Sequence, residues 1–140
     1  MFMGKGEEAR ATLAQLEATA RNNGERRQAH FWEAASYVGE GDTAKALGAL
    51  GKMAALADQD HDLAVKSGDV NLIGQVLLHA GKPDEAQAKF GESVRLLDGV
   101  DVPAGVKEGN WCNNLYFEAR VALAKGDVKA VVAKAAAFRT

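Results

Sequence analysis

Apolar residues along this chain recur at steps of three and four, and short polar stretches interrupt them. In residues 70–80, VNLIGQVLLHA, the apolar positions fall on one face of a helix. Gly81 follows the last of them, where a left-handed helix C-cap costs glycine least. Pro83 then fits a first helical turn, because its missing N–H would be unpaired there in any case. Residues 70–97 therefore predict two antiparallel helices joined by a tight turn.

The same turn pattern occurs three more times along the chain. Its other copies are GKGEEARATL at 4–13, GDTAKALGAL at 41–50 and GDVKAVVAKA at 126–135. An alanine stands five residues after the glycine in three of the four copies, and an apolar residue stands nine after it in every copy. The glycines at 4, 41, 81 and 126 are 37, 40 and 45 residues apart. Self-similarity at such a spacing is typical of solenoids and other arrays.

A first helix precedes each of the last three turns. Seven residues before each turn glycine stands a small residue, which lets two helices approach closely: Ala34, Gly74 and Ala119. We therefore predict an all-α fold of about seven helices, stacked as antiparallel hairpins. Each hairpin buries one face against its neighbour and is not expected to be stable by itself. The approximate units of this single domain are a half repeat at 1–24 and full repeats at 25–58, 62–98 and 106–140.

The order of small residue, aromatic or leucine, glycine and alanine resembles the tetratricopeptide repeat, and residues 70–97 match it best. The repeats are longer than the roughly 34 residues of that family. We expect the extra length in the connections at 57–69 and 98–110. The resemblance implies a right-handed α-solenoid whose first helices line a concave groove that holds a partner peptide. Because the first turn copy has little chain before it, we expect a segment of a longer protein.

The groove implied by the resemblance would present aromatic, amide and basic side chains. Counting back from each turn glycine places eight residues on it: Gln28, Phe31, Asn71, Gln75, His79, Asn113, Tyr116 and Arg120. Aromatic residues and arginine dominate binding hot spots, and amides can pair with the backbone of an extended peptide. The alternative is that Phe31 and Tyr116 pack between hairpins, as large aromatic residues usually do.

Composition and charge exclude several other classes of protein. The formal net charge of −2 gives no basic surface for nucleic acid or acidic lipid. No apolar run approaches the roughly 20 residues that a membrane-spanning helix needs, so we expect no membrane insertion. Cys112 is the only cysteine, which rules out a disulfide within the chain. The compartment is not fixed by these features, and a cytoplasmic location is slightly favoured over a periplasmic one.

Candidate chemistry is sparse along the chain. Four aspartates have the spacing of a calcium-binding loop: Asp58, Asp60, Asp62 and Asp69. Leu63, however, stands where that loop needs glycine, and Asp69 where it needs a bidentate glutamate. No cluster of serine, histidine and acid is visible, and no close carboxylate pair lies in an apolar setting.

These observations predict no enzyme activity, no metal site and no cofactor. The function that we expect is binding of a protein or peptide partner on the concave face. The alternative is a spacer or self-association segment of a larger multidomain bacterial-type regulator or envelope protein, with copies pairing through the open ends of the solenoid.

Overall fold

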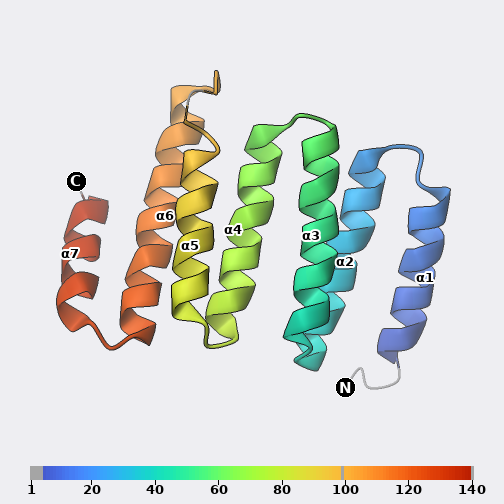
Figure 1. The fold of residues 1–140 in the computed structure, drawn as a ribbon, viewed down its shortest axis with the longest axis horizontal. Coiled ribbons are helices and arrows are strands. Elements are labelled where there is room, and N and C mark those ends of the chain that lie inside the picture. The colour runs from blue at the N-terminus through green and yellow to red at the C-terminus, as the bar shows by residue number, and fades with distance from the viewer. Residues whose placement is uncertain (1–4, 99, 140) are drawn as a thin grey trace. The chain divides into compact units, whose positions relative to one another are not determined.

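The computed structural model describes residues 5–98 and 100–139, and every regular element in these ranges is an α-helix (Figure 1). The seven helices of this part are α1 (Lys5–Thr19), α2 (Asn23–Glu40), α3 (Thr43–Gln59), α4 (Leu63–His79), α5 (Pro83–Arg95), α6 (Ala104–Ala124) and α7 (Val128–Arg139). They divide into two compact units, which we call unit 1 (Met1–Asp62) and unit 2 (Leu63–Thr140). Within the described residues, no helix combines the length and the apolar character needed to cross a bilayer.

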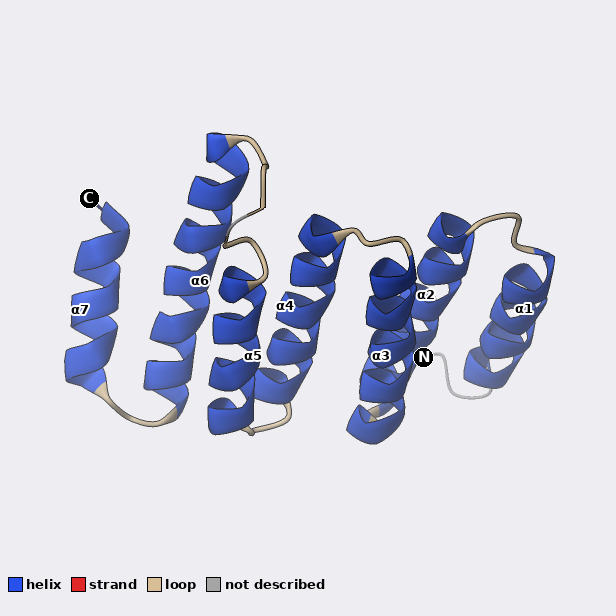
Figure 2. Cartoon of the chain, turned by 45° about the horizontal axis from the view of Figure 1, so that its top comes forward, coloured by secondary structure: helices blue, strands red, loops and turns tan. Residues whose placement is uncertain are grey.

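Within each unit, successive helices run antiparallel and pack on one another. In unit 1, α2 contacts both α1 and α3. In unit 2, the contacts run from α4 to α5, from α5 to α6 and from α6 to α7, and most of the connections are short loops (Figure 2). The predicted fold class, an all-α array of antiparallel helix hairpins, is confirmed. The right-handed superhelix implied by the resemblance stays a prediction.

Three of the predicted turn glycines adopt the left-handed conformation, with φ of 77° at Gly41, 79° at Gly81 and 75° at Gly126. Each turn closes with a pair of backbone hydrogen bonds of the Schellman type. At the first turn, the N–H of Gly41 donates to the C=O of Val38, and the N–H of Asp42 donates to the C=O of Tyr37. The fourth predicted glycine, Gly4, lies outside the described residues.

A further turn of the same kind joins α3 to α4, and the sequence did not reveal it. His61 takes the left-handed position with a φ of 54°. Its N–H donates to the C=O of Asp58, and the N–H of Asp62 donates to the C=O of Ala57. The expectation of a long connection at 57–69 is therefore wrong, because α3 continues to Gln59 and α4 begins at Leu63. The helical backbone from Leu63 onward also precludes a calcium-binding loop at this point.

The core of unit 2 is built around Phe90 of α5, whose side chain is fully buried. The ring packs against the backbone of α4 at Gly74, where an added Cβ would lie 2.6 Å from Cε1 of Phe90. On its other side the ring stacks on Phe117 of α6, with centroids 4.8 Å apart and an interplanar angle of 15°. Three helices therefore meet at one side chain, and the small residue predicted at position 74 is what allows α4 to approach α5.

Two buried serines fix the packing of α4 on α5. The hydroxyl of Ser67 donates to the backbone oxygen of Ser93 at 2.7 Å, and the hydroxyl of Ser93 donates to the backbone oxygen of Ser67 at 2.8 Å. Both hydroxyls are thus hydrogen-bonded inside the core, where an unpaired hydroxyl would be costly. Because the two bonds are reciprocal, they also hold one helix at a defined height along the other.

Substitution of Gly74 by alanine tests this core. The new methyl group would collide with a ring that has no space to move, so we expect Gly74→Ala to lower the free energy of unfolding by about 1–3 kcal/mol. Gly68→Ala is the matched control on the same helix, because no atom lies within 4 Å of a Cβ there. The control should be neutral or stabilising by up to about 1 kcal/mol. Urea denaturation measures both, and equal effects of the two substitutions would show that α4 and α5 do not meet at Phe90.

Substitution of His61 by glycine tests the unexpected turn. A left-handed conformation costs a non-glycine residue roughly 1–2 kcal/mol, so His61→Gly should raise the free energy of unfolding by about 1 kcal/mol. Gly81→Ala is the reciprocal change in an equivalent turn and should lower it by a similar amount. Thermal melts of both variants measure the effect, and a destabilised His61→Gly protein would contradict the strain assigned to position 61.

Candidate functional site

An open groove of about 330 Å³ lies on α2 and α3 in unit 1. Its lining consists of apolar and aromatic side chains with an amide, a guanidinium and a glycine: Gly24, Arg27, Gln28, Phe31, Trp32 and Met53. Gln28 and Phe31 were both predicted from the sequence to face a partner. The groove therefore contains both residues of unit 1 that the sequence predicted for the site, Gln28 and Phe31.

The aromatic wall of this groove is accessible to solvent. Phe31 is 37% exposed and Trp32 is 53% exposed, and their rings meet edge to face with centroids 5.2 Å apart. Arg27 also lines the groove, and its Nη1 donates to the backbone oxygen of Met53 at 3.0 Å, which joins α2 to α3. The sequence did not indicate Trp32 or Met53. Trp32 could have been found from its place beside Phe31, whereas Met53 joins the groove only through the packing of α3 on α2.

The predicted residues of unit 2 lie on α4 and α6, the first helices of two successive hairpins, which contact each other. Asn71, Gln75 and His79 belong to α4, and Asn113, Tyr116 and Arg120 belong to α6. His79, Asn113, Tyr116 and Arg120 are exposed, and Gln75 is half-buried. Asn71 departs from the prediction because its side chain is buried. Its Oδ1 accepts a hydrogen bond of 2.7 Å from Nε2 of Gln75, so Asn71 helps to orient the amide of Gln75.

Tyr116 connects this surface to the core of unit 2. Its ring meets that of Phe117 edge to face at 5.1 Å, and Phe117 in turn stacks on Phe90. On the outer side, the guanidinium carbon of Arg120 lies 5.9 Å from the centroid of the Tyr116 ring. The side chain of Tyr116 is 51% exposed, and the adjacent Phe117 takes the buried position. A continuous row of rings thus leads from the buried Phe90 to an exposed arginine.

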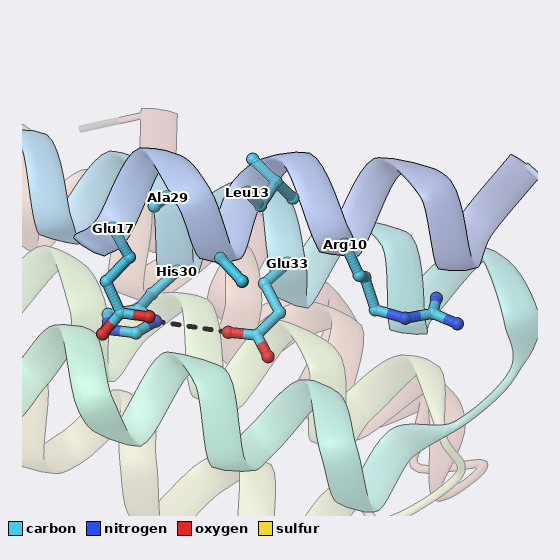
Figure 3. Close-up of a pocket in the computed structure, with 7 residues that line it drawn as sticks. Arg10, Leu13, Glu17, Ala29, His30 and Glu33 are labelled. Atoms are coloured by element: carbon cyan, nitrogen blue, oxygen red, sulfur yellow. Dashed lines mark hydrogen bonds and ion pairs between the residues drawn. The ribbon is translucent and has the colours of Figure 1, made fainter. Parts of the chain in front are cut away.

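A small polar pocket of about 40 Å³ lies between α1 and α2 in unit 1 (Figure 3). His30 is buried there, with Nε2 3.2 Å from Oε1 of Glu17 and Nδ1 3.2 Å from Oε2 of Glu33. Because the two carboxylates lie at different ring nitrogens, a single ion bound to His30 could not reach both of them. Among the described residues, no group of three histidine, cysteine or acidic side chains is placed to hold a metal ion.

Arg10 borders the same pocket and fastens α1 to the far end of α2. Its Nη1 donates to Oε1 of Glu40 at 2.7 Å and to Oγ of Ser36 at 3.0 Å, and its guanidinium lies 4.7 Å from the centre of the Tyr37 ring. The hydrogen bond to Glu40 holds the pKa of Arg10 above its usual range. Together with His30, this cluster joins two helices, and its geometry offers no nucleophile with an adjacent base.

Comparison of the chain with models of protein families, with curated proteins and with solved structures gave no significant match. The tetratricopeptide resemblance therefore rests on the residue pattern alone.

The two faces of α6 can be separated by mutation. Replacing both Tyr116 and Arg120 by alanine should change the free energy of unfolding by less than about 1 kcal/mol, because these side chains are exposed. Phe117→Ala on the buried face should lower it by about 3–5 kcal/mol. Urea denaturation followed by circular dichroism measures both variants. A collapse of helicity in the double variant would place Tyr116 in the core and remove it from the candidate site.

Proposed function

We propose that this chain is a non-catalytic interaction module of the tetratricopeptide-like kind, which holds an extended segment of a partner protein on the first helices of its hairpins. The main support is the recurrence of an exposed aromatic residue at one position of the repeat. Phe31 and Tyr116 each stand ten residues before a turn glycine, Gly41 and Gly126, and both are exposed on first helices. Accessible aromatic side chains at a regular position are typical of binding hot spots.

The surroundings of both aromatic residues support this proposal. Phe31 borders a groove with an amide, Gln28, at its edge, and Tyr116 stands one turn from the amide of Asn113. Amide side chains can donate to and accept from the backbone of an extended peptide, so they are suited to hold a chain of variable sequence. Both aromatic residues lie on helices rather than loops, so the fold fixes the backbone that carries them, which lowers the entropy lost on binding.

Self-association is the second candidate function, and an apolar patch on unit 2 favours it. Leu123 at the end of α6 and Val128 and Val132 on α7 are each more than 60% exposed. Clustered exposed apolar side chains often mark contacts between proteins. Light scattering over a tenfold range of concentration distinguishes the two candidates, because self-association raises the molar mass above the 14.8 kDa of one chain.

Selection from a random peptide library on the immobilised protein tests the proposed module. We expect enriched peptides whose affinity falls by roughly thirtyfold or more when a hot-spot aromatic residue is removed. The variants are Phe31→Ala with Trp32→Ala in unit 1 and Tyr116→Ala in unit 2, each measured by fluorescence anisotropy. Trp111→Ala is the control, because Trp111 is similarly exposed at 47% but belongs to neither candidate surface. If no peptide is enriched, or if the control loses binding equally, the proposal fails.

A further inference from the structure

The exposed surface of α6 carries a positive charge without a matching negative one. Arg120 has no carboxylate partner within the described part of unit 2, and its one described contact is the ring of Tyr116. The nearby acid on α6, Glu118, already has two partners. Its Oε2 forms an ion pair with Nζ of Lys134 on α7 at 2.5 Å, and its Oε1 accepts a hydrogen bond from Nδ2 of Asn114 at 3.0 Å. Lys125, the residue that directly follows α6, pairs with Asp84 at 2.6 Å. The other predicted residues on this surface, from α4 and α6, are amides, a histidine and a tyrosine, so none of them would repel an anion.

The contact with Tyr116 favours one position of the Arg120 side chain before any partner binds. Its guanidinium lies within the distance at which a cation is attracted to an aromatic face. Tyr116 is held by Phe117, and Phe117 by the buried Phe90, so the ring beneath the guanidinium is anchored to the core of unit 2. A side chain that is already ordered loses less entropy when it forms an ion pair. Arginine also presents a planar pair of donors that matches the two oxygens of a carboxylate.

We infer that the partner segment held by unit 2 carries an aspartate or glutamate side chain that pairs with Arg120, with Asn113 meeting the adjacent peptide backbone. This inference rests on the proposed function and specifies the partner as an acidic peptide segment. Charge complementarity supports it, since the surface supplies the cation and the partner must supply the anion. The carboxylate is assigned to a side chain within the segment, because the predicted residues of unit 2 include one arginine and no lysine to grip a chain terminus.

Peptide selection on the wild-type protein and on Arg120→Gln tests this inference. Two random libraries serve as probes, one with both peptide ends blocked by fusion and one with a free C-terminus. We expect aspartate and glutamate to be enriched among blocked peptides selected on the wild type, and this enrichment to be lost on Arg120→Gln. Lys107→Gln is the control, because it removes an exposed charge from the same helix outside the candidate surface and should retain the enrichment.

A double-mutant cycle then isolates the ion pair. Changing the enriched acid of a selected peptide to its amide should weaken binding to the wild type about tenfold, weaken binding to Arg120→Lys less, and leave binding to Arg120→Gln unchanged. Peptides that are enriched without an acid, or that lose equal affinity on both proteins, would overturn the inference while the proposed function stands. Enrichment only in the free-terminus library would overturn the assignment to a side chain. If neither library is enriched, the proposed function itself fails.

Discussion

The contact between Phe90 and the bare backbone at Gly74 is the constraint on which unit 2 depends. A ring of that size fits between α4 and α6 only because position 74 has no side chain. With the ring in place, Phe117 can stack on it, and its neighbour Tyr116 is turned outward. The same packing that closes the core therefore also determines which of the two adjacent rings, Tyr116 or Phe117, reaches solvent. The rings of Phe90, Phe117 and Tyr116 thus link the packing of the core to the side chain that unit 2 presents at its surface.

Unit 1 is held together differently, by polar contacts as much as by apolar ones. Its core is rich in alanine, which lets α2 and α3 pack closely but buries little area per residue. Its first helix, α1, is instead joined to α2 by His30 between two glutamates and by Arg10 between Glu40 and Ser36. The groove of unit 1 lies on the other side of this arrangement, where α2 meets α3. The alanine-rich packing leaves Phe31 and Trp32 outside the core and available at the surface.

Much of the fold could be predicted because its signals are local. A glycine directly after the last apolar position of a helix favours a left-handed C-cap, so the turns at Gly41, Gly81 and Gly126 were identified correctly. His61 was missed because histidine has no strong preference for that conformation, and only the backbone bonds around it show the turn. The site was predicted in part, since helical register places Phe31 and Tyr116 on the surface. Register does not specify what a neighbouring helix covers, so it could not show that Asn71 is buried or that Met53 completes a groove.

The pairwise stacking of successive helices has a consequence for how the chain reaches this structure. Nearly all the packing joins helices that are adjacent in sequence, and the most distant side-chain hydrogen bond described, from Lys125 to Asp84, spans 41 residues. The loops that must close during folding are therefore short, and their closure entropy is small. Proteins with such local contacts fold rapidly, and arrays of this kind can begin to fold at any hairpin and extend from it. A chain emerging from a ribosome could thus complete its N-terminal hairpin before its last helix has been synthesised.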